Sequence, residues 1–155
     1  MLLCCSTRLG RVAASRTYST ALAVHTVNKP IHRFFHILDG IEPSGQMSSL
    51  FASPEATLHI SKASAVLSGD EIDDWVARMQ AGWRGAATLH SEANIILDHV
   101  EENVVVSHST WTAIIDGAIT AYGTHADVLE AVKSEDGELE WKFRRRVVRH
   151  LYSAA

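Results

Sequence analysis

Four long strand-like segments fill the last two-fifths of the chain, and they constrain the fold more than any other feature of the sequence. The segments are TLHSEANIILDHV, NVVVSHSTWTAIID, AITAYGTHADVLEAV and LEWKFRRRVVRHLY, and they are rich in β-branched and aromatic residues. Short turn sequences separate them at residues 101–103, 116–117 and 135–137. The pattern predicts an antiparallel meander.

The region before the meander contains helical patterns. Apolar side chains recur at spacings of three and four over residues 30–51, and Gly40 and Pro43 divide this region into a helix and a shorter helix. A strand is expected at residues 56–61. Ser68 and Glu71 have the spacing of a capping box, which predicts the start of a third helix. Helices gathered on one side of a curved sheet make an α+β domain, and three helices here would close a pocket.

The N-terminal segment has the composition of a targeting sequence. It is rich in Arg, Ser and Ala and has no acidic residue. This predicts a mitochondrial transit peptide and disordered tail over residues 1–28, with cleavage after Tyr18. Both cysteines, Cys4 and Cys5, lie in this leader. The domain of residues 29–155 is therefore expected to contain no disulfide and no cysteine ligand, and without import the protein is expected in the cytoplasm.

The bulk composition restricts the possible partners. The 155 residues suffice for one domain with a core, and no apolar run approaches the roughly 20 residues that span a bilayer. The formal charge of −4 argues against binding nucleic acid through phosphate contacts. A small apolar molecule is the expected partner, together with a second copy of the chain in a homodimer.

A series of short motifs resembles the SnoaL-like branch of the nuclear transport factor 2-like superfamily. The motifs are Ile37-Leu38-Asp39-Gly40, Leu50-Phe51, Leu67-Ser68-Gly69-Asp70-Glu71-Ile72, Thr88-Leu89-His90 through Asn94, Gly123-Thr124-His125-Ala126-Asp127 and Trp141-Lys142-Phe143-Arg144-Arg145-Arg146. The resemblance covers about residues 30–152. It implies a cone-shaped α+β barrel with a strongly curved mixed or antiparallel sheet. Its relatives include ketosteroid isomerase, scytalone dehydratase, polyketide cyclases and plain transport proteins, so the fold does not decide the function.

Polar residues occur at alternate positions of the predicted strands, where they share a face. On the first strand of the meander these are His90, Glu92 and Asn94, and on the third they include His125 and Asp127. His90 stands where many relatives keep a pocket histidine, and the resemblance implies that it acts as a base. Most relatives have an aromatic residue at the position of His125, so this histidine departs from the pattern.

These considerations define the expected site. The expected catalytic residues are His90, His125 and Asp127, and the expected substrate-binding residues are Asn94, His108, Asp39, Trp111 and Tyr122. Asp39 ends the first predicted helix, where it can serve as a carboxylate partner. A metal site of two histidines and one carboxylate is the alternative for His90, His125 and Asp127. No compact metal motif is present, and neither a metal nor a cofactor is expected.

Two functions are compatible with this sequence. The first is an enzyme, a lyase or isomerase, that performs cofactor-free acid/base chemistry on a small apolar carbonyl or hydroxyl compound. The second is a non-catalytic ligand-binding or dimeric assembly module. The remaining polar and aromatic residues are expected to be structural. His25, His32, His36, His59, His99 and His150 are expected on the surface or in packing, Trp75, Trp83 and Trp141 in the core or pocket wall, and Arg144-Arg145-Arg146 on a solvated strand face or in a dimer contact.

Overall fold

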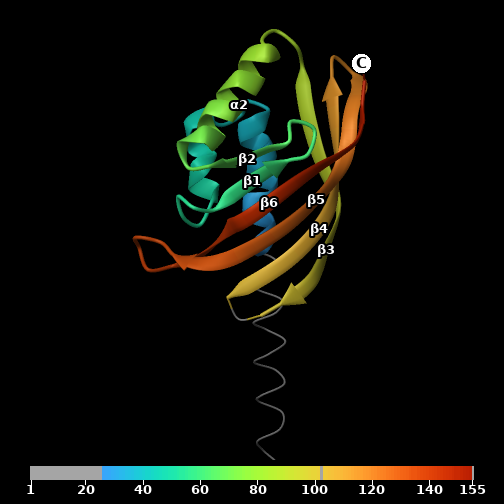
Figure 1. Cartoon of the computed structure of the whole chain (residues 1–155). Helices are drawn as coiled ribbons and strands as arrows, with labels where there is room; N and C mark the ends of the chain where they lie inside the picture. Colours follow the sequence, from blue (N-terminus) through green and yellow to red (C-terminus); the bar gives the residue numbers. More distant parts are fainter. Residues whose placement is uncertain (1–25, 102, 155) are drawn as a thin grey trace, which may run out of the picture.

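The computed structural model describes residues 26–101 and 103–154, which form one curved six-stranded sheet with helices against its concave side (Figure 1). In chain order the elements are a helix that includes residues 26–38, the 3-10 helices η1 (Ser44–Gln46) and η2 (Ser48–Leu50), β1 (Thr57–Ile60), β2 (Ala65–Ser68), α2 (Asp70–Gly82), β3 (Thr88–Val100), β4 (Val104–Ile115), β5 (Ala118–Lys133) and β6 (Leu139–Ser153). The predicted α+β class is confirmed, and the sheet curls without closing into a barrel. Within the described part of the chain, no helix has the length and apolar character needed to cross a membrane.

The N-terminal boundary of the domain differs slightly from the expected one. The first helix already includes residues 26–28, and Val27 is fully buried in the core. Most of the predicted leader, residues 1–25, lies outside the described residues, as do Tyr18 and both cysteines.

The sheet is mixed and has the strand order β2-β1-β6-β5-β4-β3. The four long strands form the predicted antiparallel meander, and β1 adds to it in parallel with β6. The turn between β4 and β5 matches its sequence signal, because Asp116 and Gly117 have φ values of 50° and 81° and such tight hairpins require two left-handed residues. The two edge strands of the sheet are β2 and β3.

Irregular pairing bends the long strands and changes which residues face inward. The register between β3 and β4 shifts after Ala93, where Asn94 has a φ of 52°. The register between β5 and β6 shifts between Tyr122 and Gly123. Gly123 also allows a close approach, since an added Cβ would lie 1.8 Å from the carbonyl oxygen of Arg149. These shifts increase the curvature of the sheet and so shape its concave face.

The helices fill the concave side of the sheet. The first helix buries apolar residues at spacings of three and four, which are Val27, Ile31, Phe34, Phe35 and Leu38. The second predicted helix is two 3-10 turns, η1 and η2. At the start of α2 half of the predicted capping box is present, because the Ser68 amide donates to Glu71 at 3.1 Å while Gly69 is the N-cap residue. Asp73 of α2 accepts two hydrogen bonds from Ser48 and so joins α2 to η2.

Candidate active site

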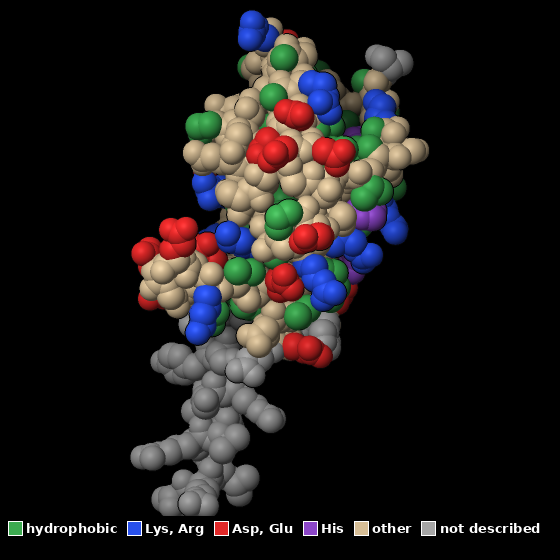
Figure 2. Space-filling model, turned by 60° about the vertical axis from the view of Figure 1, so that its left-hand side comes forward, with side chains coloured by type: hydrophobic (Ala, Val, Ile, Leu, Met, Phe, Trp, Pro, Cys, Tyr) green, Lys and Arg blue, Asp and Glu red, His purple; other side chains and the backbone are tan. Residues whose placement is uncertain are grey.

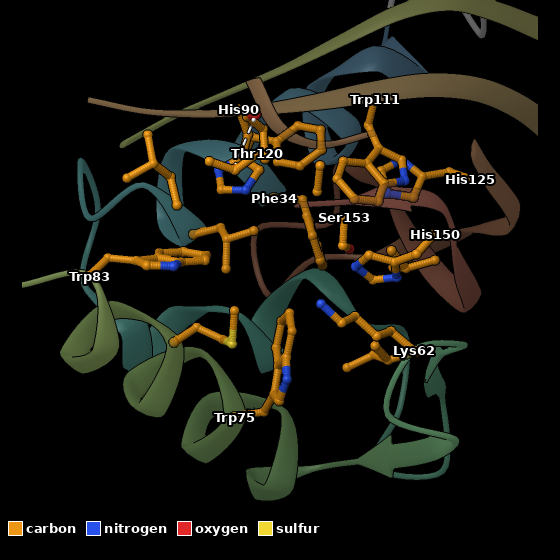
Figure 3. Close-up of a pocket in the computed structure, with 18 of the residues that line it drawn as sticks. Phe34, Lys62, Trp75, Trp83, His90, Trp111, Thr120, His125, His150 and Ser153 are labelled. Atoms are coloured by element: carbon orange, nitrogen blue, oxygen red, sulfur yellow. Dashed lines mark hydrogen bonds between the residues drawn. The ribbon is translucent and has the colours of Figure 1, made fainter. Parts of the chain in front are cut away.

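A cavity of about 260 Å³ lies between α2, the first helix and the concave face of the sheet (Figure 3). Its volume is close to the lower end of the range for small-molecule sites, roughly 300–1,000 Å³. Aromatic side chains make up much of its wall: Phe34 and Phe35 from the first helix, Trp75 from α2, Trp83 just after it, and Trp111 from β4. Such walls suit a small, flat, largely apolar compound.

His90 of β3 lines this cavity and is held by Asp39. The carboxylate of Asp39 accepts a hydrogen bond from the His90 amide at 2.8 Å and another from its ring Nδ1 at 2.5 Å. Both side chains are nearly inaccessible, with exposed fractions of 5% for His90 and 4% for Asp39. Because a carboxylate accepts the Nδ1 proton, Nε2 keeps its lone pair and is the ring nitrogen available to the cavity.

Packing fixes the plane of the His90 ring. The ring stacks on Phe35 with centroids 5.4 Å apart and planes 5° from parallel. Trp83 lies on it with a centroid distance of 5.3 Å. A histidine held by a hydrogen bond and by two aromatic rings presents Nε2 in a fixed direction.

The local fold explains how Asp39 reaches His90. Asp39 follows the last residue of the first helix, and Gly40, with a φ of 75°, turns the chain away from the helix axis. The carbonyl of Ile37 accepts from the Gly40 amide at 3.0 Å and from the side chain of Gln80 in α2 at 2.5 Å, and the second bond ties this helix end to α2. Since β3 is an edge strand, the His90 amide has no strand partner on that side and can donate to Asp39.

A second group of polar side chains is buried beside the cavity and is called here the buried charge cluster: Glu92, Ser109, His125, Asp127 and Arg146. Arg146 donates to both carboxylate oxygens of Glu92, at 2.9 and 3.1 Å. Nδ1 of His125 lies 2.7 Å from Glu92 and also contacts Arg146. Ser109 donates to Glu92, and the guanidinium carbon of Arg146 lies 4.3 Å from the centre of the Phe34 ring.

Burial and the Arg146 charge shift the pKa values in the buried charge cluster. Burial raises the pKa of Glu92, but Arg146 and His125 outweigh it and lower the value to about 2. Burial, with help from Arg146, lowers the pKa of His125 to about 4. Burial raises the pKa of Asp127 to about 7 despite Arg146, whose Nε is 3.7 Å from the Asp127 carboxylate. At neutral pH the cluster therefore combines Arg146 as a cation, Glu92 as an anion and His125 as a neutral ring.

The structure brings some of the predicted site residues together. His90, His125 and Trp111 line the cavity, and Asp39 contacts His90 from behind. Asp127 is buried, but it lies in the buried charge cluster with Arg146 and does not line the cavity.

Three predicted substrate-binding residues lie away from the cavity. His108 points to the other face of β4, where it is half exposed and pairs with Asp98 at 2.9 Å, because the inward residues of β4 are the odd-numbered ones. Asn94 sits at the bulge of β3, which turns its side chain toward Thr110 on the outer face. The inward residues of β5 are also odd-numbered, so Tyr122 points outward, where it stacks on Tyr152.

Other site residues were not expected from the sequence. Lys62, in the turn between β1 and β2, and His150 of β6 both line the cavity, although His150 had been assigned to the surface or to packing. Arg146 was expected on a solvated face or in a dimer contact and is instead fully buried, whereas Arg144 and Arg145 are exposed. The pairing of β6 with β5 places Arg146 beside Asp127. Arg146 could have been identified as a buried residue only if this strand register had been known.

The alternative metal set is not assembled. His90 pairs with Asp39, while His125 and Asp127 belong to the buried charge cluster. Within residues 26–101 and 103–154, no group of three or more His, Cys, Asp or Glu side chains is arranged to hold a metal ion.

Sequence comparison finds no family model and no curated protein that matches this chain. Structure comparison finds many solved structures with the same fold. A protein from Novosphingobium aromaticivorans, provisionally identified as a scytalone dehydratase, has a TM-score of 0.72 and 21% identity over 89% of this chain and 90% of that chain. Aln2 from a Streptomyces species has a TM-score of 0.68 and 19% identity over 82% and 89%. The hexachlorocyclohexane dehydrochlorinase LinA-type3 from Novosphingobium barchaimii has a TM-score of 0.66 and 15% identity over 89% and 92%. The chain therefore has the SnoaL-like, nuclear transport factor 2-like fold that its sequence motifs implied.

Proposed function

We propose that this protein is an enzyme that transfers protons with its own side chains, and that it acts on a small carbonyl or hydroxyl compound held in the aromatic cavity. The main support for this proposal is the Asp39–His90 pair. His90 lines the cavity, and its Nδ1 donates to the Asp39 carboxylate at 2.5 Å. A histidine oriented in this way is suited to general-base catalysis near neutral pH.

In the proposed reaction Nε2 of His90 removes a proton from carbon beside a carbonyl or beside a leaving group. Asp39 holds the ring in the required tautomer and stabilises the imidazolium that forms, as a buried carboxylate does behind other catalytic histidines. The protonated ring can then return the proton to another atom, which gives isomerisation, or to a departing hydroxyl, which gives loss of water. The lyase and isomerase classes both follow from this one pair.

The names of two similar structures support elimination as one form of this chemistry. One is provisionally a scytalone dehydratase and the other is a hexachlorocyclohexane dehydrochlorinase. A dehydratase and a dehydrochlorinase each remove a proton and a leaving group. At such low identities these structures support only a shared fold. The proposed chemistry rests on the geometry of Asp39 and His90 in this chain.

His125 and Asp127 have different roles in this proposal. His125 lines the cavity as a neutral ring and orients the substrate, while Glu92 and Arg146 hold it from behind. Asp127 does not reach the cavity and acts as a structural partner of Arg146.

The proposal also includes a homodimer, as expected from the sequence. Several large apolar side chains are exposed on strands of the sheet: Leu89, Ile96, Ile119, Tyr122, Leu151 and Tyr152. Pairing of two such faces would remove this surface from water. Light scattering after size exclusion should give the mass of two chains, and Leu151→Glu should shift it toward one. A monomeric wild-type protein would contradict the dimer.

The test of the proposed chemistry uses hydrogen–deuterium exchange, which needs no knowledge of the natural substrate. β-Tetralone, a bicyclic ketone whose benzylic protons beside the carbonyl are acidic, is incubated with the protein in deuterated buffer and followed by proton NMR. The wild-type protein should accelerate exchange, and His90→Asn should lose roughly 10²–10⁴-fold of that acceleration. His108→Asn is the matched control, since His108 is on the outer face. Equal rates for wild type and His90→Asn would contradict the proposal and favour a binding module.

A further inference from the structure

The ionisable groups on the cavity wall have an unusual balance. Among the described residues, those that line the cavity include Lys62, His90, His125 and His150, and they include no aspartate, glutamate or arginine. The nearest carboxylates, Asp39 and Glu92, are already bonded to His90 and to Arg146. The wall therefore offers a lysine and three imidazole rings but no carboxylate, which favours a ligand that carries negative charge.

Lys62 is positioned at the cavity by the turn that carries it. The amide of Ser61 donates to the carbonyl of Val148 at 3.0 Å, and the hydroxyl of Ser61 accepts from the amide of His150 at 3.0 Å. These two bonds fix the start of the β1–β2 turn to β6. Lys62 then extends into the cavity on the same side as His150, while His90 and Trp83 lie on the other side (Figure 3). Within the described residues no carboxylate lies at ion-pair distance from the Lys62 amine.

His150 has an unsatisfied polar atom at the same place. Its ring packs edge-on against Trp111 with centroids 4.9 Å apart, and its Nδ1 is buried without a hydrogen-bond partner among the described residues. Burial, followed by the charge of Lys62, lowers the pKa of His150. The neutral ring can donate one hydrogen bond to a ligand oxygen, and such a bond would compensate for part of the burial of its polar atoms.

Lys62 and His150 also stand beside an open depression that they line together with Ser61 and Ser153. A charged group bound there keeps part of its hydration, whereas an apolar ring deeper in the cavity is enclosed by Trp75 and Trp83. One ammonium group and one neutral imidazole match one negative charge. This balance fits a carboxylate better than a phosphate, whose second charge would have no partner.

We infer that Lys62 and His150 form a carboxylate-binding subsite, so that the substrate is a small planar acid whose carboxylate lies at the β1–β2 turn and whose reacting atoms lie at His90. The subsite extends the proposed function, because it names the class of substrate. Its effect on binding does not depend on any reaction at His90.

Binding of two matched probes tests the subsite. β-Naphthoate and its neutral amide, β-naphthamide, have similar shapes and differ in charge, and their affinities can be measured by titration calorimetry and by quenching of tryptophan fluorescence. The wild-type protein should bind the naphthoate at least about tenfold more tightly, as expected for a charge-assisted hydrogen bond. Lys62→Met should abolish this preference without weakening the amide, and His150→Phe should reduce it. Lys133→Met removes the same charge from the exposed end of β5 and should leave the preference intact.

The outcomes separate this inference from the proposed chemistry. His90→Asn should retain the preference for naphthoate, because His90 is on the other side of the cavity. Equal binding of the two probes by wild type, or an unchanged preference in Lys62→Met, would overturn the carboxylate subsite. A retained preference together with exchange that does not depend on His90 would overturn the proposed chemistry and leave the subsite standing.

Discussion

Asp39 and His90 are 51 residues apart in the sequence, and the Asp39 carboxylate accepts two hydrogen bonds from His90, one from its amide at 2.8 Å and one from its ring at 2.5 Å. Asp39 directly follows the first helix and His90 lies near the start of the edge strand β3, so this contact joins the helical layer to the sheet. It also fixes which ring nitrogen faces the cavity. The proposed chemistry depends on this contact more than on any other.

Asp39→Asn tests the tautomer directly. The asparagine oxygen can still accept from the His90 amide, but its NH₂ group would then face Nδ1, and Nε2 would carry the ring proton. We expect β-tetralone exchange to fall at least about 100-fold while the cavity still binds β-naphthoate. Exchange at the wild-type rate in Asp39→Asn would show that the carboxylate does not determine the tautomer of the His90 ring.

Arg146→Met tests whether Arg146 stabilises the buried charge cluster. Arg146 is fully buried and bonds both oxygens of Glu92, so its removal leaves a buried carboxylate without a cation. Breaking a buried pair in this way costs about 3–5 kcal/mol. Arg145→Met is the matched control, since Arg145 is exposed on the adjacent position of β6 and should change the free energy of unfolding by less than about 0.5 kcal/mol. Equal effects of the two variants in chemical denaturation would argue against the cluster.

The pH dependence of stability should change in Asp127→Asn. Burial raises the pKa of Asp127 from its ordinary value of 3.8 to about 7, so between about pH 4 and pH 7 the folded state holds a proton that the unfolded state has lost. The contribution of Asp127 to stability is therefore present below about pH 4 and is lost as the pH rises to 7. Asparagine is neutral at every pH, so the Asp127→Asn variant does not lose stability in this way.

We therefore expect Asp127→Asn to gain stability relative to wild type from pH 4 to pH 7.5, on the order of a few kcal/mol. The pKa of His125, lowered by burial to about 4, makes stability rise with pH over the same range in both proteins, and its effect cancels in the comparison. Guanidinium unfolding at several pH values measures the difference. A difference that does not vary with pH would contradict the raised pKa of Asp127.

The sequence predicted the meander well because its strands are long and its turns carry strong signals. Asp116 and Gly117 mark one turn, and the structure places both in the left-handed region. His90 and its Asp39 partner were also identified, since one lies in a motif at the start of a strand and the other at the end of a helical pattern.

The rest of the site depended on strand register, which alternation alone does not determine. The bulge at Asn94 exchanges the inward and outward faces of β3, whereas on β4 and β5 the inward residues are the odd-numbered ones. The side chains of Asn94, His108 and Tyr122 therefore all point away from the cavity in which they were predicted to lie. Lys62 and His150 are brought together by the parallel pairing of β1 with β6, which leaves no short-range pattern in the sequence. Residues far apart in the chain that meet across a sheet are identified only once the register is known.

Gly123→Ala tests the register of β5 against β6. An added Cβ would lie 1.8 Å from the carbonyl oxygen of Arg149 and 2.9 Å from the indole nitrogen of Trp111, so the two strands would have to separate. We expect a loss of about 3 kcal/mol or more, seen as a lower melting temperature. Gly82→Ala, at the end of α2 with open space around it, should be neutral or slightly stabilising. A neutral Gly123→Ala would mean that the strands do not approach this closely.

Rescue with imidazole tests whether Nε2 of His90 moves the proton. His90→Gly keeps the amide that donates to Asp39 and leaves space beside Phe35 and Trp83 for an added imidazole. We expect β-tetralone exchange to fall roughly 10²–10⁴-fold in His90→Gly, and added imidazole to raise the exchange rate of this variant at least about tenfold. His108→Gly should exchange at the wild-type rate with or without imidazole. Exchange at the wild-type rate in His90→Gly, or a reduced rate that imidazole does not raise, would show that Nε2 of His90 does not move the proton.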